Sequence, residues 1–172
     1  TLGYPRRALR LYQAATLVTR EHGGELPRTV AELRRLPGVG SYTAAAVASF
    51  AFGQRHAVLD TNVRRVLGRV FAGTEYPPPS GPGAAERGLA EAVLPAQDAV
   101  AARWAIAAME LGALVCTARA PACDSCPIAA ACAWRAAGMP SYAGPPRSGQ
   151  TYEGTDRQAR GRILAALRRR ES

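Results

Sequence analysis

Four cysteines lie close together near the end of the chain and could bind one metal centre between them. They are all the cysteines of the sequence, in the order Cys116, Cys123, Cys126 and Cys132, with the spacing C-x6-C-x2-C-x5-C. Structural zinc sites usually present two C-x2-C pairs separated by a longer arm. Here one such pair has a single cysteine on either side. This arrangement favours a [4Fe–4S] cluster over zinc or disulfides.

Asp60 is the second residue whose position suggests chemistry. It follows an apolar approach, residues 57–59, and stands at the start of a helical pattern. An aspartate in this position is a good helix N-cap, which is the simpler interpretation. The apolar approach also suits a carboxylate delivered to a partly buried site. There Asn62 could hydrogen-bond it, and Arg64 and Arg65 would supply positive surface.

A tight turn, residues 36–40 with the sequence LPGVG, lies between two short helical patterns. Its glycines, Gly38 and Gly40, permit a turn in which the backbone N–H groups at the start of the next helix point outward. Such amides can hold a phosphate without a charged side chain. An ordinary helix–helix turn would look the same in isolation. The basic chain and Asp60, about 20 residues downstream, favour phosphate binding.

These residues must be positioned by helices, because helical periodicity of the apolar residues runs through most of the chain and predicts an all-α fold. The expected helices cover residues 6–21, 29–35, 41–52, 63–71, 84–93, 98–115 and 156–170. Pro, Gly and Ser dominate the stretch before the last of them and indicate a linker. We expect a helical domain at residues 1–115, a metal-binding loop with a following helix at 116–137, a linker at 138–155 and a basic helical tail at 156–172.

The charge of the chain indicates a polyanionic partner. Of its 172 residues 48% are hydrophobic, and the net charge is +9. All 22 basic residues are arginines, so no lysine of this chain could form a Schiff base. The sequence contains no signal peptide or membrane-spanning run. We therefore expect a cytoplasmic protein with reduced thiols.

The hairpin, the downstream aspartate and the four-cysteine loop together resemble the helix–hairpin–helix DNA glycosylase superfamily, and more narrowly its MutY-type adenine DNA glycosylases. The stretches that carry the resemblance are LGY (2–4), LPGVGSYTA (36–44), VLDTNVRRVL (58–67) and MELGALVC (109–116). The similarity extends from residue 2 to about residue 135, with a looser continuation at residues 149–152. Each motif is moderately specific alone, whereas their order and spacing together are highly specific.

This resemblance implies a monofunctional base-excision repair enzyme. It would hydrolyse the N-glycosidic bond of adenine paired with 8-oxoguanine or guanine in double-stranded DNA. Asp60 would stabilise the sugar cation, Asn62 would orient Asp60, and Tyr42 would line the pocket for the flipped base. The cysteines would hold a structural [4Fe–4S] cluster. The expected enzyme is a monomer that acts at the bacterial nucleoid, without membrane contact.

The resemblance also implies a set of DNA contacts. The hairpin and the start of the following helix would bind backbone phosphate, and arginines would add further phosphate contacts. Tyr4 would wedge into the duplex beside the lesion, although an aromatic residue at a helix start also packs often on a core. The expected DNA-binding residues are Tyr4, Gly38, Val39, Gly40, Ser41, Tyr42, Thr43, Arg64 and Arg119.

The closest alternative within the superfamily is endonuclease III, which shares the hairpin and the cysteine spacing. That family has a lysine nucleophile two residues after the second hairpin glycine, where this chain has Tyr42. The difference disfavours a Schiff-base lyase step and favours simple hydrolysis. Removal of other damaged bases by an endonuclease III-like enzyme stays the alternative activity.

Two parts of the family pattern are absent from the sequence. The glutamate that protonates the leaving base belongs to a segment before the position of Thr1, and Glu21, Glu25 and Glu32 do not match it. The C-terminal domain that reads 8-oxoguanine is absent as well. We therefore expect a fragment that is inactive alone. A non-catalytic DNA-binding module, with Asp60 only a cap, and a small zinc-stabilised interaction domain are the other classes that remain open.

Overall fold

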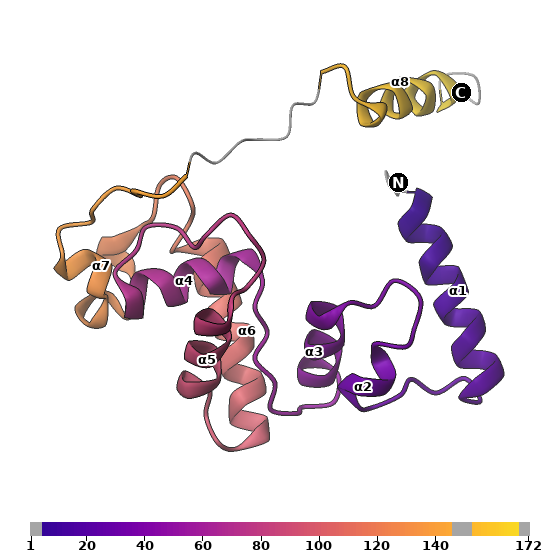
Figure 1. Cartoon of the computed structure of the whole chain (residues 1–172), viewed down its shortest axis with the longest axis horizontal. Helices are drawn as coiled ribbons and strands as arrows, with labels where there is room; N and C mark the ends of the chain where they lie inside the picture. Colours follow the sequence, from indigo (N-terminus) through magenta and orange to yellow (C-terminus); the bar gives the residue numbers. More distant parts are fainter. Residues whose placement is uncertain (1–4, 146–152, 169–172) are drawn as a thin grey trace.

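The computed structural model of the chain describes residues 5–145 and 153–168, and within these ranges it is helical without a β-strand (Figure 1). The expected all-α fold is therefore confirmed. The helices are α1 (Pro5–Glu21), α2 (Val30–Leu33), α3 (Ser41–Phe50), α4 (Thr61–Ala72), α5 (Ala84–Val93), α6 (Asp98–Leu114), α7 (Ala133–Ala136) and α8 (Asp156–Arg168). Short 3₁₀ turns, η1 (Cys123–Ser125) and η2 (Ala129–Ala131), lie in the cysteine loop.

Local sequence explains where the helices next to the candidate site begin and end. At the start of α2 the Thr29 side chain accepts a hydrogen bond from the Glu32 N–H over 3.2 Å and donates one to the Glu32 carboxylate over 2.6 Å. Thr29 is therefore the N-cap of α2, and its hydroxyl also bonds the side chain of Glu32. Asp60 is the N-cap of α4, directly before its first residue, and Gly73, with a φ of 64°, ends the same helix in the left-handed conformation.

The first three helices enclose one small hydrophobic core. Its buried residues come from α1, α2, α3 and the turn between the last two: Ala14, Val18, Leu33, Leu36, Ala44 and Ala48. Four partly buried residues, Leu17, Val30, Val39 and Val47, pack against them. Apolar contacts with this core thus hold one side of the hairpin turn, and its other side faces solvent.

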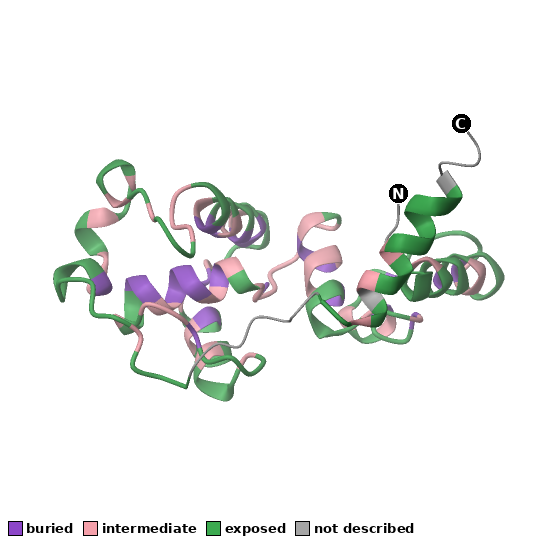
Figure 2. Cartoon of the chain, turned by 90° about the horizontal axis from the view of Figure 1, so that it is seen from above, coloured by how far each residue is buried: buried purple, intermediate pink, exposed green. Residues whose placement is uncertain are grey.

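A second core forms around α4, which packs against α5, α6 and α7. Buried residues gather on α4 (Figure 2), where Val63, Val66, Leu67 and Val70 supply the apolar face. Spacing of three and four residues puts these side chains on one side of the helix. The start of α4, which carries Asp60, is therefore held by a packed core and not by a free loop.

The two cores are joined where α3 packs against α6. Both helices pack through small side chains. Ala44 and Ala48 of α3 and Ala101 and Ala105 of α6 are almost fully buried. Alanine permits close approach of helix backbones and has high helix propensity. The alanine-rich composition therefore serves helix packing.

The last described helix, α8, contributes little to either core. Its apolar residues Ile163, Leu164 and Leu167 are exposed, as expected for a basic tail with little core to join. None of the helices in the described part of the chain is long and apolar enough to cross a membrane. Tyr4 and residues 149–152, which entered the family resemblance, lie outside the described residues.

Candidate functional site

The hairpin turn and the first turn of α3 form one exposed strip. Leu36 is buried in the first core, and its carbonyl oxygen accepts a hydrogen bond from the Val39 N–H over 3.1 Å. Gly38 has a φ of 80°, which favours glycine. Gly40 occupies the N-cap of α3 and provides no capping side chain. The backbone N–H groups of residues 41–43 are therefore oriented outward at the positive end of the helix, where an anion binds well.

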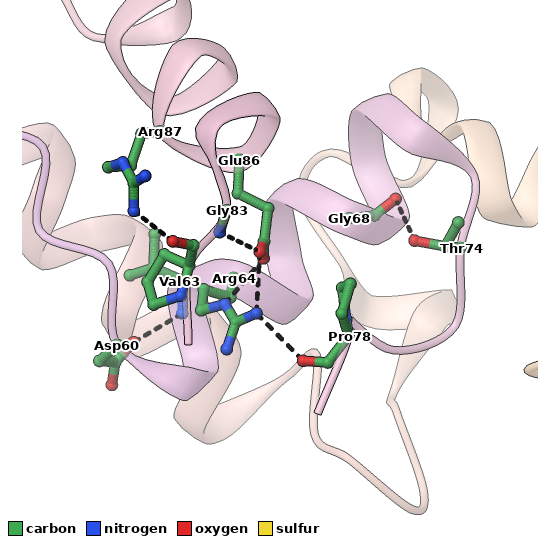
Figure 3. A network of polar contacts seen from close by, with 10 residues as sticks. Asp60, Val63, Arg64, Gly68, Thr74, Pro78, Gly83, Glu86 and Arg87 are labelled. Carbon is green, nitrogen blue, oxygen red and sulfur yellow. Dashed lines mark hydrogen bonds and ion pairs between the residues drawn. The ribbon is translucent and has the colours of Figure 1, made fainter. Parts of the chain in front are cut away.

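Asp60 lies at the end of the irregular segment 54–60, which follows the turn that ends α3, and it caps α4. One carboxylate oxygen accepts a hydrogen bond from the Val63 N–H over 2.7 Å (Figure 3), and the other accepts one from the Asn62 side-chain amide over 3.2 Å. The simpler interpretation, an N-cap, therefore describes the contacts of this residue. The same contacts hold both oxygens of a half-buried carboxylate in one direction, which a catalytic carboxylate also needs.

Arg55 fastens the segment that leads to Asp60. Its guanidinium donates hydrogen bonds to the Pro95 carbonyl oxygen and to the Glu91 carboxylate, each over 2.9 Å. A further bond reaches the Glu91 carbonyl oxygen over 3.0 Å. Arg55 thereby ties this segment to the C-terminal end of α5, whose last carbonyl groups lack helical partners.

A buried arginine, Arg65, connects the aspartate with the cysteine loop. It donates to the Asn62 side-chain oxygen over 2.9 Å and to the Cys116 carbonyl oxygen over 2.8 Å, and it also bonds the Gly112 carbonyl oxygen. Desolvation lowers the pKa of Arg65, although the nearby Cys116 and Asp60 raise it in part. Hydrogen bonds therefore run without a break from Asp60 through Asn62 and Arg65 to the backbone of the first cysteine.

Tyr42 links the hairpin strip electrostatically with Asp60. Its side chain is half-exposed, and partial burial raises the pKa of its phenol, with a further contribution from the negative charge of Asp60. The negative charge of Asp60 therefore acts on the Tyr42 phenol at the start of α3. That Tyr42 lines a base pocket stays a prediction.

Arg64 makes a different set of contacts from those its predicted role would need. Its guanidinium donates to both carboxylate oxygens of Glu86, over 2.7 and 2.8 Å, and to the Pro78 carbonyl oxygen over 3.1 Å (Figure 3). The side chain is only 10% exposed. In this structure Arg64 fastens α5 and the preceding loop to α4, and its contact with DNA stays a prediction.

The four cysteines line one cavity under the end of α4. Its walls also include Arg69, Val70 and Leu111 from the helices and Trp134 from α7. Burial raises the pKa of the Cys123 thiol, and the neighbouring Cys116 raises it further. Among the described residues no three Cys, His, Asp or Glu side chains converge on a single point where one metal ion would sit. All four thiols thus line the same cavity.

Arg69 lines this cavity and is almost fully buried. One of its N–H groups lies 3.3 Å from the Cys116 sulfur, and its guanidinium lies 4.5 Å from the centre of the Trp134 ring. It also donates to the carbonyl oxygens of Thr117, over 2.8 Å, and Glu75, over 3.0 Å. A buried positive charge beside the thiols favours their deprotonated form, which is the form that binds metal.

Arg65 and Arg69 were not among the predicted site residues. Arg65 was expected to supply positive surface at the start of the helix, but it is buried, and Arg69 is buried in the last turn of the same helix. Their spacing of four residues, inside the apolar pattern of Val63, Val66 and Val70, was the available signal. Arg119, which was predicted to contact DNA, is exposed in the loop between the first two cysteines.

Comparison with known proteins finds similarities both in sequence and in fold. The family model of the helix-hairpin-helix motif matches residues 21–50. The adenine DNA glycosylase of Mycobacterium tuberculosis (strain CDC 1551 / Oshkosh) is 52% identical over 171 residues, which are 99% of this chain and 55% of that protein. The chain therefore spans about half the length of this relative.

The fold is also found in solved structures. A thermostable thymine-DNA glycosylase superposes with a TM-score of 0.65 at 33% identity, over 76% of this chain and 59% of that one. A non-covalent complex of endonuclease III with DNA gives a TM-score of 0.63 at 27% identity, over 78% of this chain and 60% of that one. By sequence this chain is thus a homologue of the adenine DNA glycosylases, and by fold it belongs with the helix–hairpin–helix DNA glycosylases.

Proposed function

We propose that this chain carries the phosphate-binding hairpin and the sugar-facing carboxylate of a monofunctional adenine DNA glycosylase. The observation that carries the proposal is the way the Asp60 carboxylate is held, with one oxygen bonded by the Val63 N–H and the other by the Asn62 amide, in a chain that also presents the exposed hairpin strip. A module that only bound DNA would need the hairpin but not this carboxylate.

Hydrolysis of an N-glycosidic bond passes through a sugar with oxocarbenium character, so a carboxylate close to the sugar lowers the barrier. Asp60 would face that charge after the adenine has left the stack. The Asn62 amide keeps one of its oxygens in place. The family resemblance assigns protonation of the leaving adenine to a glutamate, and Glu21, Glu25 and Glu32 do not match that residue.

DNA would bind first through its phosphates. The outward N–H groups of residues 41–43, with Gly38, Val39 and Gly40, would grip one strand, and Arg119 would contact phosphate from the cysteine loop. Phosphate contacts position the protein but carry no base information. Preference for a duplex with adenine opposite 8-oxoguanine or guanine is therefore a separate part of the proposal. We also propose that the enzyme is a monomer and that it acts at the bacterial nucleoid.

The cysteine cavity would hold a [4Fe–4S] cluster through Cys116, Cys123, Cys126 and Cys132. Four thiols that line one cavity, with a single C-x2-C pair flanked by two lone cysteines, suit a cluster in which each thiolate binds a different iron. Arg69 would stabilise the bound thiolates by charge and by its N–H contact with Cys116. When bound, the cluster would cross-link the loop and so fix Arg119 and the Cys116 backbone.

The proposal is tested by Asp60→Asn in the full-length protein. We expect the rate of adenine excision from an 8-oxoguanine pair to fall on the order of 100-fold or more, because the carboxylate acts when charge develops on the sugar. Binding of the duplex should change little. Single-turnover excision assays and a titration of labelled duplex measure the two effects.

Two results would contradict the proposal. One is full excision by Asp60→Asn. The other is a borohydride-trapped imine formed through the region after the hairpin, since Tyr42 cannot form a Schiff base.

A further inference from the structure

Arg10, on α1, lies across the hairpin turn. A Cβ atom built on Gly38 would fall 2.8 Å from the Arg10 Cβ, 3.0 Å from its Cδ and 3.4 Å from its Cγ. The apolar stem of Arg10 therefore occupies the space that Gly38 leaves open. Gly38 serves both the turn, through its positive φ, and this close contact.

The charged end of Arg10 is available for a ligand. The residue is exposed, and among the described residues no hydrogen bond or ion pair engages its guanidinium. Arg64 and Arg69, by contrast, are held by carboxylate or carbonyl oxygens. The guanidinium follows Cδ by two bonds, so it lies beside the turn whose neighbouring amides, at residues 41–43, favour an anion.

We propose that Arg10 is a DNA phosphate contact that acts together with the hairpin. The inference rests on the proposed function, because it requires that the hairpin face DNA. An arginine fork can bind two oxygens of one phosphate, next to the amides of α3. Contact with Gly38 already positions the stem, so less side-chain entropy is lost on binding than for a free surface arginine.

The test is Arg10→Gln in the full-length protein, with affinity for a duplex measured at several salt concentrations. We expect several-fold weaker binding at low salt, and a slope of log K against log salt that is smaller by about 0.9, as for one lost phosphate contact. The effect should be equal for duplexes with and without an 8-oxoguanine pair, because phosphate carries no base identity. Arg10→Lys should restore most of the slope.

Arg20→Gln is the matched control. It removes the same charge from an exposed position on α1, about 15 Å farther along the helix axis. An equal loss of slope in both variants would overturn the proposal in favour of a general charge effect. A wild-type slope in Arg10→Gln, with a lowered unfolding temperature, would assign Arg10 a purely structural role.

The wild-type protein separates this inference from the proposed function. If it fails to bind duplex DNA, both fall. If it binds and excises adenine while Arg10→Gln keeps the wild-type slope, only the Arg10 contact is overturned.

Discussion

At the scale of single residues, the candidate site depends on polar side chains whose partners are distant in the sequence. Arg65 is the central example, since it bonds Asn62 on its own helix and the Gly112 and Cys116 carbonyl oxygens at the end of α6. A guanidinium is suited to this place because its donors are arranged in a fixed planar fork. Arg65 therefore fixes the Asn62 side chain, which in turn bonds Asp60.

Arg65→Gln should weaken both the fold and the chemistry. It leaves buried carbonyl groups without donors, so we expect a free energy of unfolding lower by roughly 3 kcal/mol. Adenine excision should fall more than DNA binding, because Asn62 loses its support. Denaturant unfolding and single-turnover assays measure these effects. Arg65→Lys keeps the charge but not the planar fork, so its stability and its excision rate should lie between those of the wild type and of Arg65→Gln. Excision at the wild-type rate in Arg65→Gln would contradict the role given to these hydrogen bonds.

At the scale of helices, the crossing of α4 and α6 decides where Asp60 stands. A Cβ atom built on Gly112 would lie 2.8 Å from the Asn62 Cβ and 2.9 Å from the Asn62 carbonyl oxygen. Any larger residue would push back the backbone at the start of α4. The glycine thus allows α6 to touch the helix turn that carries the carboxylate.

Gly112→Ala should consequently impair catalysis more than its small size suggests. Overpacking here should cost about 1–3 kcal/mol of stability. Displacement of Asp60 by as little as an ångström could lower excision on the order of 100-fold. Thermal unfolding and excision assays test both effects.

Gly88→Ala is the control for this substitution. Gly88 lies within α5, where an added Cβ meets nothing within 4 Å. It should stabilise the protein by roughly 0.5–1 kcal/mol through helix propensity and leave excision unchanged. If Gly112→Ala behaved like Gly88→Ala, the close crossing would not matter for the site.

At the scale of the whole molecule, the site lies where two cores meet. The hairpin belongs to the core of α1, α2 and α3, whereas Asp60 and the cysteine cavity belong to the core around α4. Contact between α3 and α6 joins them. The proposed DNA binding and the proposed chemistry thus depend on separate parts of the molecule, which explains why Asp60→Asn and Arg10→Gln are expected to affect different steps.

The purified protein should contain about four irons and four sulfides and be brown. Replacing Cys116 with Ser should abolish this content and lower stability, because metal binding contributes to folding of such loops. Iron, sulfide and zinc analyses of anaerobically prepared protein make the test. Stoichiometric zinc without sulfide would contradict the cluster assignment.

The sequence alone determined the local features of this protein. The helices, the glycine turn at residues 36–40, the cap at Asp60 and the spacing of the cysteines depend on residues a few positions apart, and periodicity and capping rules describe such relations. The hydrogen bond between Asn62 and Asp60 was foreseeable for the same reason.

Only the tertiary structure decided which arginines face solvent. Arg64, which looked like a surface cation, is paired with Glu86 across 22 positions. Arg65 and Arg69 turn inward to carbonyl groups more than 40 positions away, and Arg10 lies on Gly38. A guanidinium on a long flexible stem can be solvated, paired or buried with the same local sequence. Its environment is fixed by which helices pack together, and that depends on the whole chain.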